Sequence, residues 1–263
     1  MAGLVAHRGA LVDAQAEPRL SGMLAAVVGA RRSLSPSRTS RQRTPSLKDH
    51  GYTELKKLGK GQFGYAILVR REESREHYVA KLMPYKQLNV EEKEFISREV
   101  RVMSHISNEG GHPYLVRFRQ AFTTGGSGPH SGKLCIIMDY CDGGDLQHAI
   151  RAHAKKGERF TEAQVKLWLL QLLSAVDFLH CRRVLHRDIK PANIFMHSGV
   201  CKLGDLGLSK QVRMTATKKQ AHTQCGSPLY LAPEVHMGQS YGKAVDIWSV
   251  GCTLFELMML SHA

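Results

Sequence analysis

The stretch VLHRDIKPANIF, residues 184–195, is the most informative part of the chain. It brings Asp188, Lys190 and Asn193 together in one short segment. The carboxylate of Asp188 can orient a hydroxyl group and accept its proton, and Lys190 can reach a developing negative charge. The amide oxygen of Asn193 is a suitable Mg²⁺ ligand. A single aspartate in a loop is more often a turn or cap residue, so this interpretation depends on what the rest of the chain adds.

A second carboxylate follows in a short hairpin. NIFMHSGVCKLGD, residues 193–205, predicts two short strands with Ser198-Gly199 as their turn. It ends at Asp205, which lies in the sequence Asp-Leu-Gly twelve residues after Asn193. We expect Asn193 and Asp205 to hold Mg²⁺ together, because acids are needed where phosphate charge is neutralised.

Three glycines near the start of the folded region predict a phosphate-binding flap. LGKGQFGYAILV, residues 58–69, has Gly59, Gly61 and Gly64 between two strand-like runs. Glycine lets backbone N–H groups approach phosphate oxygens without interference from a Cβ atom. The same spacing can open a dinucleotide-binding unit, but that unit needs a helix directly after Gly64. The following residues predict strand and turn, which favours a flap.

A lysine and a glutamate complete the expected phosphate site. Lys81 lies in an apolar strand predicted at His77–Met83, where its charge needs a partner. Glu99 lies in a predicted helix over residues 90–106, whose buried face is formed by Ile96, Val100, Met103 and Ile106. We expect Lys81 and Glu99 to pair and to hold the lysine against the α- and β-phosphates of ATP.

The pattern of elements predicts an α+β fold with two lobes. Strands expected at Tyr65–Arg70, His77–Met83 and Lys133–Asp139 form a small antiparallel β lobe. After Gly143 the pattern turns helical, with capping-box spacing between Thr161 and Gln164. The chain finishes in DIWSVGCTLFELMML, residues 246–260, which is apolar on nearly every side. Such a helix expects to be buried all round, and without neighbours it exposes a hydrophobic face.

Residues 52–260 resemble a eukaryotic protein kinase. HRDIKPANIF, KLGDLGLSK and GSPLYLAPE are most similar to the NIMA-related (never-in-mitosis) group, and KPAN after HRD is the Ser/Thr form. The resemblance implies a Ser/Thr protein kinase that transfers the γ-phosphate of ATP to Ser or Thr hydroxyls of protein substrates, with Mg²⁺ as the metal. It implies Asp188 as the catalytic base, supported by Lys190, Lys81 and Glu99.

The resemblance also assigns supporting roles. It implies that Met103, Phe118, Leu206 and His186 form a stacked spine anchored by Asp246. In the activation segment it implies Thr223 as an activating phosphosite that pairs with Arg187, and Ser227 as a residue near Asp188. The residues implied to bind the nucleotide are Leu58, Gly59, Gly61, Gly64, Ala66, Ala80, Lys81, the gatekeeper Met138, Asp139 and Cys141 of the hinge, Asp145 and Phe195.

Two departures from the kinase pattern leave alternatives open. Ala66 replaces the usual valine above adenine, which removes two methyl groups from the ceiling of the pocket. The chain stops at Ala263, 29 residues after Glu234, so we expect the last helices of a kinase lobe to be absent. A partner covering the exposed face of the C-terminal lobe is then expected. The alternatives are a truncated, non-catalytic ATP-binding or scaffold fragment, and a basic interaction protein that merely retains a kinase scaffold.

Charge and composition bound the organisation of the chain. The formal net charge is +14, and residues 1–50 and 51–263 are both basic, but no reading helix or aromatic platform suggests specific nucleic-acid binding. We expect residues 1–50 to be a disordered basic tail rich in Ser and Arg, with a transit peptide as the alternative. Residues 51–263 are expected to be the kinase domain, with the N-terminal lobe and the start of the hinge at 51–139 and a partial C-terminal lobe at 140–263.

The six cysteines and the apolar segments suggest a location. The cysteines form no C-x-x-C pair, and no apolar stretch is long enough to span a membrane. We therefore expect a cytoplasmic protein, with a nuclear or cytoskeletal location as the alternatives implied by the resemblance.

Overall fold

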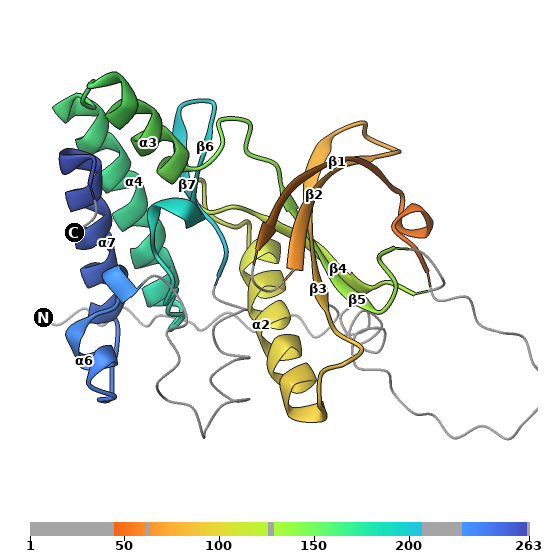
Figure 1. Ribbon diagram of the computed structural model, residues 1–263. Helices are drawn as coiled ribbons and strands as arrows, with labels where there is room; N and C mark the ends of the chain where they lie inside the picture. Colours follow the sequence, from red (N-terminus) through yellow and green to blue (C-terminus); the bar gives the residue numbers. More distant parts are fainter. Residues whose placement is uncertain (1–44, 62–63, 126–128, 207–227, 262–263) are drawn as a thin grey trace, which may run out of the picture.

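The computed structural model describes residues 45–61, 64–125, 129–206 and 228–261. The described chain forms a small β-rich lobe and a larger helical lobe (Figure 1). The predicted α+β, two-lobed architecture is confirmed. Within the β-rich lobe the strand order is β1-β2-β3-β5-β4, and every neighbouring pair is antiparallel. The strands are β1 (Tyr52–Gly61), β2 (Gly64–Arg71), β3 (His77–Pro84), β4 (Phe118–Thr123) and β5 (Lys133–Asp139).

Helix α2 (Val90–Asn108) packs on one face of the sheet. It begins at Asn89, whose side chain accepts from the Glu92 N–H while the Glu92 side chain accepts from the Asn89 N–H. This reciprocal cap satisfies two backbone donors that a helix start leaves unpaired. The predicted stripe of Ile96, Val100, Met103 and Ile106 is buried, as expected.

The opposite face of the sheet carries an outer cluster of buried residues. It contains Leu47, Tyr52, Ile67, Val69, Tyr78, Ala80, Leu82, Phe122, Cys135 and Ile137. Leu47 is 5% exposed and precedes the 3-10 turn η1 (Lys48–His50). The predicted tail boundary at residue 50 is therefore wrong for residues 45–50, because Leu47 buries its side chain against the lobe. Residues 1–44 lie outside the described part.

The helical lobe is built around α4 (Glu162–Cys181), which lies beside α3 (Leu146–Lys156) and α7 (Ala244–Met259) in Figure 1. Thr161 and Gln164 form the predicted capping box at the start of α4. Trp168, Leu172 and Leu179 of α4 share one core with Val250 and Leu257 of α7. The short elements η3 (Pro228–Tyr230) and α6 (Pro233–His236) precede α7.

The predicted hairpin lies between the two lobes (Figure 1). Its strands β6 (Ile194–His197) and β7 (Val200–Leu203) follow the turn η2 (Pro191–Asn193) and pair in register, with His197 opposite Val200. Ser198 and Gly199 both have left-handed backbones, with φ of 50° and 78°. This is the geometry that a tight two-residue hairpin needs.

Helix α7 leaves a broad apolar face uncovered by the described residues. Ile247, Trp248, Phe255 and Met258 are each 41–49% exposed. The expectation that this helix exposes a hydrophobic face is confirmed. None of the described helices combines the length and the apolar character needed to cross a bilayer.

Candidate active site

A cavity of about 730 Å³ lies between the lobes and collects most of the predicted site. Its walls include Lys81 from β3, Asp188 and Asn193 from the segment before the hairpin, and Asp205 directly after β7. Lys81 lies more than a hundred positions before the other three residues, and all four side chains line the same cavity. Other predicted residues on its walls are Leu58, Gly59, Gly64, Ala66, Met138, Asp139, Cys141, Asp145, Lys190 and Phe195.

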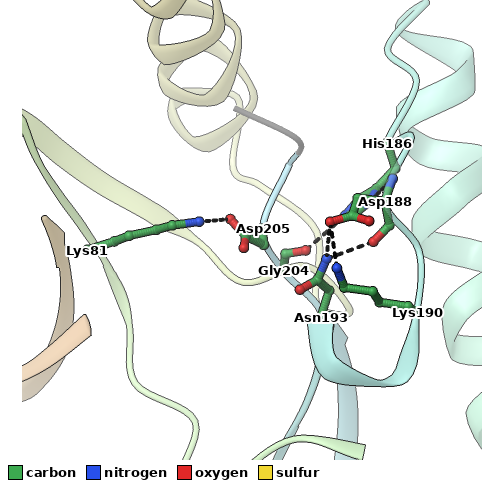
Figure 2. Close-up of polar contacts among 7 residues, drawn as sticks. All are labelled: Lys81, His186, Asp188, Lys190, Asn193, Gly204 and Asp205. Carbon is green, nitrogen blue, oxygen red and sulfur yellow. Dashed lines mark hydrogen bonds and ion pairs between the residues drawn. The ribbon is translucent and has the colours of Figure 1, made fainter. Parts of the chain in front are cut away.

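The carboxylate of Asp188 is held by two neighbours from its own loop. Lys190 Nζ lies 3.0 Å and Asn193 Nδ2 lies 2.9 Å from Asp188 Oδ2 (Figure 2). The same Asn193 amide also donates to the Asp188 carbonyl at 2.7 Å. Both donors fix the direction of the carboxylate, and the bonding of the amide nitrogen leaves the Asn193 oxygen turned away from Asp188.

Asp246, at the start of α7, accepts hydrogen bonds from the backbone of this loop. Its Oδ2 accepts from the His186 N–H at 2.9 Å, and its Oδ1 accepts from the Arg187 N–H at 2.8 Å. His180 Nε2 lies 2.7 Å from Oδ2. Asp246 is 0% exposed, so these bonds operate away from water. Arg187 has a left-handed backbone with φ of 65°, and the anchor holds the loop in this conformation.

His186 connects the loop to Asp205. Burial lowers the pKa of His186, with the charge of Asp246 acting in the opposite direction. The imidazole is therefore neutral and has one N–H. His186 Nε2 lies 2.9 Å from the carbonyl oxygen of Gly204, which can only accept, and His186 Nδ1 accepts from the Asp188 N–H at 3.3 Å. One neutral side chain thus joins the backbones beside both carboxylates (Figure 2).

Lys81 pairs with Asp205 and not with Glu99. The Lys81 ammonium is bonded directly to the Asp205 carboxylate (Figure 2). The predicted Lys81–Glu99 ion pair is absent from the described residues, because the Lys81 ammonium bonds to Asp205 instead. Burial raises the pKa of Glu99, and the positive charge of Arg187 partly opposes this shift. Glu99 therefore lies within the electrostatic reach of Arg187.

The donor set suits Mg²⁺ that is shared with phosphate. No group of three or more His, Cys, Asp or Glu side chains among the described residues is arranged to hold a metal alone. Mg²⁺ commonly takes one or two protein oxygens and completes its shell with water and substrate phosphates. Asn193 and Asp205 on the cavity wall supply that number, so the residues present fit the metal.

The flap over the cavity requires glycine at position 64. A Cβ atom there would lie 1.9 Å from the Leu82 carbonyl oxygen of β3, and the backbone has φ of +152°. Gly64 therefore lets β2 lie directly on β3. Gly61 pairs with Gly64 at the end of the β1–β2 hairpin, and its contact with the nucleotide stays a prediction.

The prediction that Ala80 contacts the nucleotide is wrong. Ala80 is fully buried in the outer cluster, and its neighbours Val79 and Lys81 line the cavity. Successive side chains of a strand point to opposite faces, so a residue next to Lys81 cannot share its face. The same alternation, applied to the sequence, would have found Val79.

The far end of the cavity is formed by the hinge and by the start of α3. Burial raises the pKa of the Cys141 thiol to about 11, so the hinge cysteine is a neutral thiol. Asp145 caps α3 by accepting from the His148 N–H at 2.9 Å, and the His148 ring Nδ1 lies 2.7 Å from its other oxygen. Sequence reasoning missed His148, although its three-residue spacing from Asp145 was a usable signal. It also missed Val116, Tyr65, Lys60, Asp142 and Gly144 on the walls.

The predicted stacked spine combines residues of both lobes, namely Met103, Phe118, Leu206 and His186. Met103 and Phe118 belong to the buried cluster between α2 and the sheet, and Leu206 packs against that cluster. His186 is 1% exposed and is joined to Leu206 through the backbone of Gly204 and Asp205.

Thr223 and Ser227, predicted for the activation segment, lie outside the described residues.

The protein kinase domain family matches residues 52–262 of the chain. The serine/threonine-protein kinase Nek1 of Mus musculus is 39% identical over 213 residues, which are 81% of this chain and 16% of Nek1. Nek5 of Homo sapiens is 36% identical, over 80% of this chain and 28% of Nek5. Nek3 of Mus musculus is 36% identical, over 80% of this chain and 38% of Nek3.

The chain thus spans well under half the length of these curated relatives. The family match, by contrast, extends over nearly the whole of both lobes, from the first strand of the sheet to the end of α7. The chain therefore belongs to the protein kinase family, and its relatives within that family are the NIMA-related serine/threonine kinases.

Proposed function

We propose that this chain is a Ser/Thr protein kinase that transfers the γ-phosphate of ATP to Ser or Thr hydroxyls of other proteins. The observation that carries the proposal is the meeting of Lys81, Asp188, Asn193 and Asp205 on the wall of one cavity. These groups supply what phosphoryl transfer requires, namely positioning of the acceptor and neutralisation of phosphate charge.

Asp188 orients the acceptor hydroxyl and takes its proton. Its Oδ2 is held by Lys190 and Asn193, so the carboxylate keeps one direction while the substrate enters. Lys190 Nζ also reaches the negative charge that develops on the transferring group. Mg²⁺, when bound by Asn193 and Asp205, neutralises charge on the phosphate oxygens.

Lys81 contributes to nucleotide binding from the roof of the cavity. Its ammonium already faces the space next to Asp205, where the phosphates of ATP must lie if the metal is held there. Leu58, Gly59, Gly64 and Ala66 form the flap side for the base and phosphates. Met138, Asp139 and Cys141 line the opposite end, where adenine would meet the hinge, and Asp145 and Phe195 complete the pocket.

Regulation through the activation segment is part of the proposal. Thr223 is proposed as the activating phosphosite, with Arg187 as the partner of its phosphate, and Ser227 as a residue that shapes the acceptor site. Arg187 supports this assignment, because its Nε is buried and has no hydrogen-bond partner among the described atoms. A buried guanidinium nitrogen without a partner is costly, and a phosphate oxygen would satisfy it.

The partners follow from the same chemistry. The substrates are proteins, ATP is the phosphate donor, and neither specific nucleic acid nor a membrane span is part of the proposal. The location we propose is the cytoplasm. The exposed apolar face of α7 suggests that a further protein surface covers it, since contiguous apolar patches of this kind mark interaction sites.

Transfer of radiolabelled phosphate from ATP to casein tests the proposal. Asp188→Ala and the isosteric Asp188→Asn should both lose transfer by about 10²-fold or more, while each binds ATP·Mg about as well as the unaltered chain. Asp177→Asn, an exposed change on α4, is the matched control and should keep full activity. Equal transfer by the Asp188 variants and the unaltered chain would remove the enzyme hypothesis. Binding of ATP·Mg without any transfer would favour the non-catalytic alternative.

A further inference from the structure

His130 contacts side chains of both strands that carry the glycine flap. Its ring Nε2 is 2.8 Å from Glu54 Oε2 on β1, and its ring Nδ1 is bonded to the Tyr65 hydroxyl on β2. The His130 side chain is 16% exposed, so it is largely buried. One imidazole therefore contacts both arms of the β1–β2 hairpin.

His130 is hydrogen-bonded at both ring nitrogens. The Glu54 carboxylate can only accept, so His130 Nε2 carries the hydrogen of that bond, and Nδ1 is bonded to the Tyr65 hydroxyl. Lys133 Nζ donates to the same Tyr65 oxygen at 3.0 Å and lies 4.8 Å from the centre of its ring. A chain of donors and acceptors thus runs from β5 through β2 and His130 to β1, and such chains strengthen each member.

Hydrogen bonds fix the described residues next to His130 to the sheet. The Thr124 N–H donates to the Lys133 carbonyl at 2.8 Å, and the Gly132 N–H donates to the Thr124 carbonyl at 2.8 Å. The Thr124 hydroxyl donates to the His130 carbonyl, and Lys133 Nζ donates to the Pro129 carbonyl at 2.7 Å. The backbone next to His130 is thereby anchored on both sides, so its side chain approaches the flap from a fixed base.

Tyr65 transmits this contact to the cavity. It lies between Gly64, whose backbone rests on Leu82, and Ala66, which lines the cavity. The Tyr65 side chain packs against the outer cluster, and because strand side chains alternate, Ala66 faces the nucleotide side. A shift of Tyr65 therefore moves the ceiling of the cavity and the glycine that closes it.

We propose that His130 is a positioning residue for the nucleotide. It holds β1 and β2, the two strands of the flap, at the distance from the rest of the cavity that ATP requires. This inference rests on the proposed function, since it assumes that ATP is the molecule under the flap. His130 touches neither ATP nor the reacting atoms and acts through Tyr65 and Glu54. Its effect should therefore fall on ATP binding and leave the chemical step almost unchanged.

The first test is the affinity for ATP·Mg, measured by calorimetry on the full chain. His130→Ala should raise the Kd, and the KM for ATP, about threefold to tenfold, the range expected for one or two lost hydrogen bonds. The kcat should change by less than about twofold if the chemical step is untouched. His130→Gln, whose amide can still donate to Glu54 or accept from Tyr65, should recover part of the loss. Tyr65→Phe should match His130→Ala, and the double variant should be no worse than either.

Hydrogen exchange supplies a readout that does not need turnover. In His130→Ala the backbone amides of β1 and β2 should exchange faster, while those of α4 keep their rates. The matched control is His105→Ala, which removes a histidine–glutamate contact of 3.1 Å to Glu109 on the far surface of α2. It should leave both the Kd and the flap exchange unchanged.

The possible failures are distinguishable. If the unaltered chain binds ATP·Mg and His130→Ala binds it equally well with unchanged exchange, the inference is wrong and the proposed function stands. If the unaltered chain binds no ATP·Mg at all, the proposed function is wrong, and the inference falls with it. A loss of binding in His105→Ala equal to that in His130→Ala would show general destabilisation and would also overturn the inference.

Discussion

Lys81 and Asp205 are bonded directly to each other across 124 positions of the chain and across the two lobes. Their side chains are 20% and 31% exposed, so solvent still reaches the pair. Ion pairs with this access contribute about 0–1 kcal/mol. The contact is weak enough for a metal and phosphates to replace it, as the proposed function requires.

Substitutions of Lys81 and of Asp205 should affect ATP binding in different ways. Lys81→Met should lower transfer by about 10²-fold or more, because a charge facing the phosphates is lost, while Mg²⁺ still strengthens ATP binding. Asp205→Asn should lower transfer similarly but should abolish the dependence of ATP binding on Mg²⁺. Titration of ATP with and without Mg²⁺ separates the two effects.

An exposed change, Lys155→Met on α3, is the control for the loss of a positive charge. Mg²⁺-dependent ATP binding that survives in Asp205→Asn would contradict the assignment of the metal site.

Glu99→Gln should stabilise the fold at neutral pH. Burial raises the pKa of Glu99 above its ordinary value of 4.5. Between that value and the raised one, the folded chain holds a proton that the unfolded chain has released, so stability falls as pH rises through this window. The neutral glutamine removes this penalty. The Tm of Glu99→Gln should exceed that of the unaltered chain at pH 7, and the difference should shrink as the pH falls toward 4.5.

Glu94→Gln, on the exposed side of the same helix, is the matched control and should show little difference at either pH. A Tm advantage of Glu99→Gln that is the same at both pH values would rule out titration of Glu99 as the cause.

Local spacing was enough to predict the loop that brings Asp188, Lys190 and Asn193 to the cavity wall. Asp188, Lys190 and Asn193 lie within one short segment, and the hairpin that carries Asp205 has its own turn signal at Ser198-Gly199, so each could be located without a partner. Periodicity also predicted the buried face of α2. The exposed face of α7 was predicted from a sequence that is apolar on nearly every side.

Choices between competing partners could not be made from the sequence. Lys81 meets Asp205 and not Glu99, and which carboxylate it meets depends on how α2 lies against the sheet. The packing of Leu47 and the contacts of His130 likewise depend on side chains from distant strands. Ala80 was a different error, because the period of two that excludes it was already visible in the strand.

Ala66→Val should tighten ATP binding. Ala66 lines the cavity from β2, and valine would add two methyl groups above the base. At about 0.8 kcal/mol per buried group, the Kd should fall by about tenfold or less. Competition with adenosine and with tripolyphosphate checks the cause, since adenosine should gain the same factor and tripolyphosphate should gain nothing. A gain shared by tripolyphosphate would mean that the change acts through the flap backbone.

Asp246→Asn should damage the catalytic loop without touching the nucleotide. Both Asp246 oxygens accept from backbone N–H groups, of His186 on one side and of Arg187 on the other. An asparagine can satisfy one of them with its oxygen, but its NH₂ group must then face the other donor. Such a buried mismatch costs about 1–3 kcal/mol in the free energy of unfolding. Because Asp188 follows Arg187 directly, its carboxylate should lose its fixed direction, and kcat should fall by more than the stability loss alone explains.

Urea unfolding and transfer assays at a temperature where the Asp246→Asn variant is fully folded measure the two effects separately. The Kd for ATP·Mg should stay within about twofold, since the lysine, the flap and the hinge remain in place. Unchanged kcat in a folded Asp246→Asn variant would mean that the loop keeps its geometry without this anchor.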